Sequence, residues 1–330
     1  MVVNAVFQGG GVRAIGLVGA VHAAERRGFR FARVAGTSSG SIVAAFLAAG
    51  YTAAEMKEII LQTPFASFLR KSWLMRFKFV GPAARLLIKK GLYSGDRLEQ
   101  WAHDALLKKG VRTFGDLKPN QLRIIASDIS RGRLLVLPDD VAQYGIDPKR
   151  FLVSRAIRMS TSIPYFFDPV IIRLPAGARS GTSFADQFIH IVDGGLLSNF
   201  PLWLFDEKEP TGKEPGKKAQ KPIPTIGFQL VGRNANRPHR IVGPLSMFQA
   251  LFSTMMEAHD ERYIESHNRF RTVKIPTVGV HVTQFDIDRE TSLKLFESGR
   301  QAAEQFFDHW SLEQYVDQYT HFLREGKIPG

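Results

Sequence analysis

The chain has 330 residues, 44% of them hydrophobic, which is enough for one or two folded domains with a large core. It contains no cysteine, and this excludes disulfides, zinc–thiolate sites and a thiol nucleophile. The formal net charge of +13 predicts an anionic partner, such as a membrane surface, a nucleic acid or an acidic substrate. Because no secretory signal or membrane-spanning apolar run is visible, we expect a cytoplasmic protein.

Short apolar runs alternate with longer amphipathic or small-residue-rich runs, which predicts an α/β unit with a mainly parallel sheet. The predicted strands are Val2–Gln8, Phe31–Ala35, Leu122–Ala126, Gly132–Pro138, Val170–Leu174, Phe188–Val192, Thr225–Leu230, Arg271–Ile275 and Val278–Val282. The predicted helices are Val12–Arg27, Ser41–Ala49, a helix with a capping box of Thr52 and Glu55, Asp96–Lys109, Asp147–Met159, Pro244–His267, Arg289–Trp310 and Leu312–Leu323.

The segment Leu61–Lys90 has no acidic residue, and its lysines and arginines alternate with aromatic and large apolar residues. One interpretation is a solvated basic face above ordinary core aromatics. The other is a lid or interfacial patch, whose aromatic residues enter a lipid headgroup layer while its cations meet anionic lipid. The sequence supports both hypotheses.

A second unusual segment, Lys208–Pro224, is rich in lysine, glutamate, proline and glycine and has no apolar periodicity. This composition predicts a flexible surface insertion or linker. The predicted organisation is therefore a first unit over residues 5–207, an insertion over 208–224, and strands and helices over 225–330 that complete the same α/β unit.

Two glycine-rich turns near the N-terminus carry the main chemical signal. Gln8–Ala14 follows the first predicted strand, and Gly36–Ser41 follows the second. The second turn fits G-x-S-x-G with Ser38 in the serine position, which is typical of a strand–elbow–helix that exposes a nucleophilic hydroxyl. The first turn offers backbone N–H groups at a helix start beside that serine, and such donors suit a developing oxyanion.

A serine hydroxyl needs a base to take its proton, and the usual partner is a histidine held by a carboxylate. In the second half of the chain only His281 is a moderate candidate, because the other histidines fall in predicted helices, within a strand or in a basic loop. Asp193 instead ends a predicted strand and precedes Gly194 and Gly195, which allow close backbone approach. An aspartate can act as the base directly when burial raises its pKa toward the working pH.

The first glycine turn has a rival interpretation. Gly9-x-Gly11-x-x-Ala14 matches the dinucleotide-binding fingerprint, which lies after a strand and before a helix. That fingerprint requires an acid at the end of the second strand, and residues 31–36 contain none. Because Arg33 offers a contact to a 2′-phosphate instead, a non-catalytic nucleotide or nucleic-acid binding module stays as an alternative.

Taken together, the G-G-G-x-R loop, the G-x-S-x-G turn and the distant D-G-G resemble the motifs of the patatin-like phospholipases, and the chain is similar to their bacterial single-domain members. The similarity runs from about Ala5 to Trp203. Weaker matches occur at Gly91–Tyr93, at Ser160–Pro164 and in the asparagine and proline after the D-G-G. Ala14 departs from the pattern, because the family usually has a glycine there.

The resemblance implies a three-layer α/β/α sandwich with a central, mainly parallel sheet, and a catalytic domain over residues 5–207. It implies a Ser–Asp dyad without histidine, in which Ser38 is the nucleophile and Asp193 the base. The other site residues that it implies are the oxyanion loop Gly9, Gly10, Gly11 and Val12, the loop cation Arg13, and the motif glycines Gly36, Gly40, Gly194 and Gly195.

The implied reaction is hydrolysis of acyl esters of glycerophospholipids or lysophospholipids through an acyl-serine intermediate, with no metal and no cofactor. The implied partner is a phospholipid membrane surface or a lipid aggregate, with no nucleic acid, and the positive charge is consistent with peripheral membrane association. A serine hydrolase of small soluble esters would use the same dyad and stays as an alternative. The sequence leaves open the cleaved position, the headgroup, the oligomeric state and the need for an activator.

Overall fold

The computed structural model describes residues 1–69, 90–175, 183–206, 223–232, 241–243, 246–247, 250–251, 254–255, 268–282 and 284–324. Most of the segment Leu61–Lys90, the predicted insertion Lys208–Pro224 except its last two residues, and most of the predicted helix Pro244–His267 lie outside these residues. The pieces of that helix that are described, from 246 to 255, are helical.

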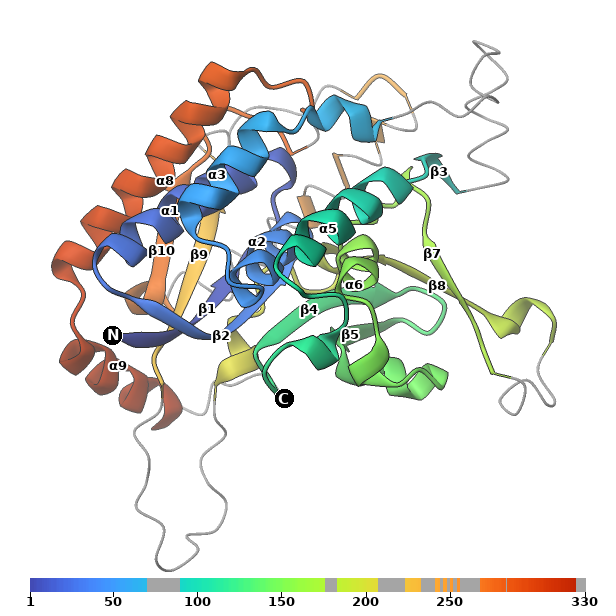
Figure 1. Ribbon diagram of the computed structural model, residues 1–330, viewed down its shortest axis with the longest axis horizontal. Coiled ribbons are helices and arrows are strands. Elements are labelled where there is room, and N and C mark those ends of the chain that lie inside the picture. Colours follow the sequence, from blue (N-terminus) through green and yellow to red (C-terminus); the bar gives the residue numbers. More distant parts are fainter. Residues whose placement is uncertain are drawn as a thin grey trace, which may run out of the picture.

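A mainly parallel sheet forms the centre of the molecule, with the strand order β10–β9–β1–β2–β4–β8–β7 and with β5 paired to β4 (Figure 1). Its strands are β1 (Val2–Phe7), β2 (Arg30–Thr37), β4 (Leu122–Asp128), β5 (Arg133–Leu137), β7 (Val170–Arg173), β8 (Phe188–Asp193), β9 (Thr225–Val231) and β10 (Thr272–Pro276). The five strands from β10 to β4 run parallel, whereas β8 is antiparallel to β4. Because β9 pairs with β1, the chain after residue 225 adds to the sheet that the N-terminal strands begin.

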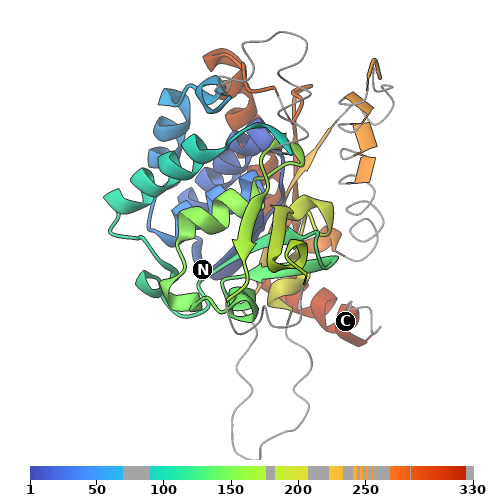
Figure 2. The same ribbon diagram turned by 90° about the vertical axis from the view of Figure 1, so that its right-hand side faces the viewer.

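Helices cover the sheet, and the described ones are α1 (Ala14–Arg26), α2 (Ser39–Ala48), α3 (Ala53–Gln62), α5 (Asp96–Lys108), α6 (Val153–Ser160), α8 (Arg289–His309) and α9 (Leu312–Arg324). In Figure 2 the blue and blue-green helices lie to the left of the sheet, and the red helix α9 lies to its right. The predicted α/β class, with a central, mainly parallel sheet flanked by helices, is confirmed.

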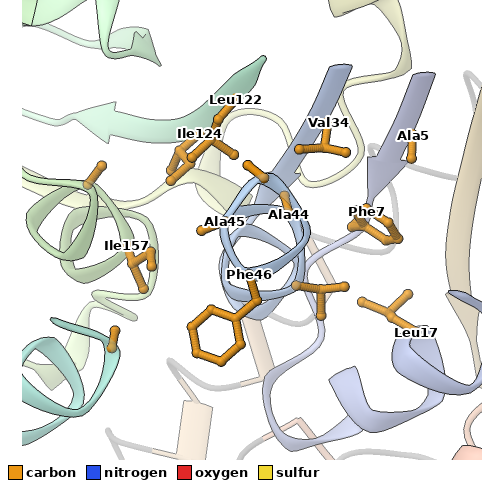
Figure 3. Packing of buried hydrophobic residues seen from close by; sticks show 14 of the residues in the cluster. Ala5, Phe7, Leu17, Val34, Ala44, Ala45, Phe46, Leu122, Ile124 and Ile157 are labelled. Carbon is orange, nitrogen blue, oxygen red and sulfur yellow. The ribbon is translucent and has the colours of Figure 1, made fainter. Parts of the chain in front are cut away.

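Alternation of side chains along the strands divides the core between the two faces of the sheet. On one face Phe7 and Val34 pack against α2, whose Ala44, Ala45 and Phe46 lie in the same apolar cluster (Figure 3). Small residues on α2 let that helix approach the strands closely, which holds the turn at its N-terminus against the sheet. A second cluster, on the other face, consists of Val6, Ala35, Phe200, Leu202 and Phe205.

Three local features differ from the sequence-based prediction. The predicted strand Val278–Val282 is a turn, because Val278 and Gly279 have left-handed φ angles of 52° and 79° that no strand can contain. The predicted helix at Asp147 begins as a short 3-10 turn, and α6 starts only at Val153. Two strands that the sequence does not predict, β3 (Gly91–Tyr93) and β6 (Tyr165–Phe167), pair in a separate sheet.

A buried ion pair ties the C-terminal elements to the segment that follows β8. Arg271 Nη2 donates to Asp206 Oδ2 at 2.8 Å, and Nη1 donates to Oδ1. Both side chains are almost completely shielded from solvent. The guanidinium also lies 5.6 Å from the ring centroid of Tyr319 and 5.3 Å from that of Phe322, both on α9. The buried ion pair therefore packs directly against aromatic side chains of α9.

We predict that Asp206→Asn lowers the free energy of unfolding by about 3–5 kcal/mol, because it leaves the Arg271 cation buried without a counter-charge. The matched control is Asp308→Asn, which makes the same change in an exposed pair with Arg27. This control should leave stability nearly unchanged. Urea unfolding of both variants measures the difference, and equal stability of the two would contradict the prediction.

Candidate active site

Ser38 lies on a sharp turn between β2 and α2, in a backbone conformation that side chains rarely adopt. Its φ is 51° and its ψ is −128°, a conformation that costs roughly 1–3 kcal/mol and persists only because the surrounding structure enforces it. The flanking glycines allow this turn to close. A Cβ on Gly36 would lie 2.3 Å from the Gly40 carbonyl oxygen, and a Cβ on Gly40 would lie 2.4 Å from the Phe7 carbonyl oxygen. The G-x-S-x-G spacing is thus a steric requirement of the elbow.

Strand register brings Asp193 to the same place. Ile124 and Ile125 of β4 pair with both β2 and β5, and Ala126 of β4 pairs with both β8 and β5. Since β5 occupies one edge of β4, β2 and β8 must share the other edge and meet end to end. Thr37 is the partner of Ile125, and Asp193 is the partner of Ala126, the next residue along. The elbow that starts after Thr37 therefore opens directly onto Asp193.

At this junction the Ser38 hydroxyl donates a hydrogen bond of 2.6 Å to Asp193 Oδ2. The other carboxylate oxygen, Oδ1, accepts a hydrogen bond of 2.8 Å from the Gly195 N–H. Gly194 makes the close turn possible, because a Cβ there would lie 2.4 Å from the Ile125 carbonyl oxygen. The D-G-G motif thus supplies the carboxylate, the space for the turn and a donor that orients the carboxylate.

Burial sets the protonation of Asp193. The side chain is 0% exposed and Ser38 is 4% exposed, so the carboxylate has lost its hydration. This desolvation raises the pKa of Asp193 to about 7, against the smaller lowering effects of the hydrogen bonds from Ser38 and Gly195. A carboxylate that exchanges its proton near neutral pH can take a proton from a hydroxyl and return it.

The glycine loop lies beside the elbow, and most of its N–H groups already have acceptors. Gly9 donates to the Asn199 carbonyl oxygen at 3.2 Å, Gly10 to Ser39 Oγ at 3.0 Å, and Val12 to the Val282 carbonyl oxygen at 3.3 Å. Within the described part of the chain, no group accepts a hydrogen bond from the Gly11 N–H. Gly11 is therefore the loop donor that has no acceptor within the protein's described residues.

The loop is also held by its cation. Arg13 is partly buried and its Nε donates to the Gly10 carbonyl oxygen at 3.1 Å, which braces the turn from inside. Ala14, which departs from the family pattern, has a helical φ of −57° and so adopts its conformation without strain. A Cβ on Gly11 would lie 2.0 Å from the Val282 carbonyl oxygen, so the turn after β10 packs directly on the glycine loop.

Supporting contacts that sequence reasoning did not assign hold the elbow in place. Ser160, at the end of α6, accepts a hydrogen bond of 2.8 Å from the Ser38 N–H and donates to the Ile125 carbonyl oxygen at 2.5 Å. Asn199 Nδ2 donates to the Gly9 carbonyl oxygen at 3.4 Å. The sequence marks both positions as weak motif matches, but only the folded chain shows what they contact.

The predicted rival base, His281, is exposed in the turn after β10. Of the histidines that the structure describes, none forms a hydrogen bond with Ser38 or Asp193. The geometry therefore joins Ser38 to a carboxylate directly, without an intervening imidazole.

An elbow serine hydrogen-bonded to a buried carboxylate, beside a glycine loop at the edge of a parallel sheet, is the arrangement that an acyl hydrolase needs. Comparison with known families agrees, because the model of the patatin-like phospholipase family matches residues 5–206. The chain therefore belongs to the patatin-like phospholipase family. At the level of the family, this makes it a lipolytic hydrolase of the esterase or lipase type.

The chain is similar to proteins from distant sources. Over 316 residues it is 41% identical to protein YqhO of Bacillus subtilis (strain 168), which covers 94% of this chain and 100% of YqhO. It is 24% identical over 282 residues to protein R571 of Acanthamoeba polyphaga mimivirus, which covers 82% of this chain and 81% of R571. The crystal structure of VipD from Legionella pneumophila shares the fold, with a TM-score of 0.51 and 14% identity over 92% of this chain. This chain spans 66% of the length of VipD.

The described helices include no candidate for a membrane span, since none of them is long and apolar enough.

Because Asp193 is buried, its replacement should stabilise the fold at high pH. The carboxyl group has an ordinary pKa of 3.8 and a folded pKa of about 7, so the folded state binds the proton more tightly. The stability that the proton provides is complete below about pH 4 and is lost as the pH rises through 7.

The substitution Asp193→Asn removes this pH-dependent loss of stability. We predict that its stability advantage over the wild type grows by roughly 2–3 kcal/mol between pH 5 and pH 8. Urea unfolding at the two pH values measures this advantage. An advantage that shrinks as the pH rises would contradict a raised pKa of Asp193 in the folded protein.

Proposed function

We propose that the protein hydrolyses acyl esters of glycerophospholipids or lysophospholipids, with Ser38 as the nucleophile and Asp193 as the general base. The observation that carries the proposal is the 2.6 Å hydrogen bond from the Ser38 hydroxyl to a buried carboxylate whose pKa is about 7. Near neutral pH about half of the molecules then hold Asp193 ionised and ready to accept the serine proton.

In the first half-reaction Ser38 Oγ attacks the ester carbonyl carbon while its proton moves to Asp193 Oδ2. The tetrahedral intermediate collapses when the C–O bond to the glycerol oxygen breaks, and Asp193 returns the proton to that leaving oxygen. In the second half-reaction Asp193 takes a proton from water, and the resulting hydroxide attacks the carbonyl carbon of the acyl-serine. The bond between that carbon and Ser38 Oγ then breaks, and the free fatty acid leaves. Ser38 then recovers its proton from Asp193, so the dyad ends as it began.

The oxyanion of the tetrahedral intermediate needs hydrogen-bond donors that are in place beforehand. Gly11 suits this role because its N–H has no acceptor among the described residues. Gly10 is the second donor that we propose, because its present acceptor is the Ser39 side chain, which can rotate away. The N–H groups of Gly9 and Val12 donate to backbone carbonyl groups, so we assign these two residues to holding the loop.

Loss of the nucleophile should abolish turnover. We predict that Ser38→Ala lowers the release of free fatty acid from mixed anionic phospholipid vesicles by at least about 10⁴-fold, because the hydroxyl that is hydrogen-bonded to the base and forms the acyl-enzyme is then missing. Asp193→Asn should cause a loss of the same order, since the hydroxyl then lacks a base. Fatty acid release is followed by extraction and chromatography, and circular dichroism checks that each variant is folded.

The matched control for these variants is His281→Ala, which should release fatty acid at the wild-type rate. Loss of turnover in His281→Ala, with turnover retained in Asp193→Asn, would show that the base is a histidine and would contradict the Ser38–Asp193 dyad. If the protein cleaves soluble esters and its rate does not rise on lipid aggregates, the dyad would stand, but the substrate would be a small soluble ester.

The rate should follow the ionisation of Asp193. A general base works only when deprotonated, so we predict that kcat/KM on a soluble ester rises with pH and levels off above a midpoint near 7. Below the midpoint the rise should approach tenfold per pH unit. A soluble substrate avoids the titration of lipid headgroups. A midpoint near 4, the ordinary range for an aspartate, would show that burial does not tune this base.

A further inference from the structure

The chain between β9 and β10 displays an exposed apolar stripe that the reaction mechanism does not use. Three large side chains, Met247, Leu251 and Met255, recur at intervals of four residues and are 53%, 53% and 39% exposed. Just before them Ile241 and Val242 are 57% and 77% exposed. Exposed apolar residues scattered singly are ordinary, but five within fifteen residues form a set that requires an explanation.

The three side chains of the row lie on the described helical pieces, and local hydrogen bonds fix the start of the first piece. Ser246 Oγ accepts hydrogen bonds of 2.9 Å from the N–H groups of Val242 and Gly243, and the Met247 N–H donates to the Gly243 carbonyl oxygen at 2.9 Å. Residues four apart lie on one side of a helix, so the three long side chains form a single row. Ala250 is buried, in contrast to the outward row. Figure 2 shows the orange helical pieces of this segment along the right-hand edge of the molecule.

The strand that precedes the stripe, β9, ends at the edge of the sheet where the site lies. β9 runs parallel to β1, so its end and the glycine loop leave the sheet on the same side. Leu230, near the end of β9, lies against that loop, because a Cβ on Gly10 would lie 2.2 Å from Leu230 Cδ1. Leu197, just after the D-G-G, and Val278, just after β10, are exposed as well. Exposed apolar side chains therefore also follow the strand ends at the edge of the sheet that carries Ser38.

The charge of the chain indicates what covers the stripe. Three arginines, at positions 233, 237 and 240, precede the row in the sequence, and acidic residues follow it from Glu257 onward. The whole chain carries a formal charge of +13. An apolar row on a protein with this excess of positive charge suits an anionic lipid surface, which takes up apolar side chains and attracts cations. A soluble partner protein would satisfy the apolar row but gives no reason for the excess of positive charge.

From this juxtaposition we infer that the row of Met247, Leu251 and Met255, with Ile241 and Val242, is the surface by which the protein docks on anionic phospholipid bilayers. The inference rests on the proposed function, since a lipid substrate is what such docking would deliver to Ser38. It assigns the docking to a segment other than Leu61–Lys90, which the sequence suggests first.

The test measures binding apart from catalysis. Vesicles of ether-linked phosphatidylglycerol offer no acyl ester to cleave, and sedimentation gives the fraction of protein bound. The stripe variant is Met247→Gln/Leu251→Gln/Met255→Gln, which keeps good helix formers on the row. The matched control is Leu107→Gln/Ile171→Gln/Val316→Gln, in which the three replaced side chains are similarly exposed, at 53%, 48% and 39%, but lie on α5, β7 and α9.

We expect the stripe variant to bind these vesicles roughly 100-fold more weakly than the wild type, equivalent to about 2.8 kcal/mol. The control should bind within about twofold of the wild type. Wild-type binding should also weaken when phosphatidylcholine replaces the anionic lipid or when salt is raised. Binding by the stripe variant that equals the wild type, or no binding by the wild type, would overturn the inference. So would a smaller assembly of the stripe variant in gel filtration, because the row would then be an interface between copies.

Hydrolysis of soluble p-nitrophenyl butyrate separates this inference from the proposed function. All three proteins should cleave it equally, because the row lies outside the dyad and the glycine loop. Wild-type cleavage that Ser38→Ala abolishes, together with failure of vesicle binding, would remove the docking surface and leave the dyad standing. No cleavage by the wild type would instead count against the proposed chemistry.

Discussion

A carboxylate without solvent contact, hydrogen-bonded to a serine hydroxyl, is the interaction on which the remaining site depends. Asp193 can receive a proton near neutral pH only because the sheet and α2 keep water away from it. That environment destabilises the ionised carboxyl group, so the surrounding structure must hold it rigidly. It does so with the Gly195 N–H, the strained elbow of Ser38 and the close backbone contacts that the motif glycines permit.

The topology of the sheet explains how two residues separated by 155 positions meet. β2 and β8 share one edge of β4 and run toward each other, so the end of each strand faces the end of the other. A parallel β8 would carry its final residue away from the elbow. The antiparallel direction of β8 is therefore what creates a serine–carboxylate pair at the end of the sheet, and the turn after β10 packs on the glycine loop.

Much of this arrangement can be predicted from the sequence, and the failures have physical causes. The long apolar runs of β1, β4 and β9 and the capping box of Thr52 and Glu55 are strong local signals, and the structure contains them. β3 and β6 have only three residues each, too few to display a period of two. Val278–Val282 has the composition of a strand, but two residues with left-handed φ angles make it a turn. A local sequence pattern does not show such effects, because they depend on contacts with distant parts of the chain.

The candidate site divides in the same way. Ser38, Asp193 and the glycines stand out because their chemistry or their steric limits constrain the sequence directly. The acceptors that hold the loop, Ser39 and the Asn199 carbonyl, do not, because hydroxyl and backbone oxygens occur everywhere and only the fold selects among them. The exposed row on the segment before β10 is likewise invisible in the sequence, where the same residues resemble an ordinary core helix.

The central claim, that Asp193 activates Ser38 directly, is tested most directly by covalent trapping with a fluorophosphonate, followed by intact mass measurement and peptide mapping. The reagent phosphonylates only a serine whose hydroxyl is activated, and it needs neither lipid nor membrane docking. We predict one adduct per chain, located on Ser38, that forms in the wild type and in His281→Ala but not in Asp193→Asn. An adduct on another residue, or equal labelling of Ser38 in Asp193→Asn, would contradict the account.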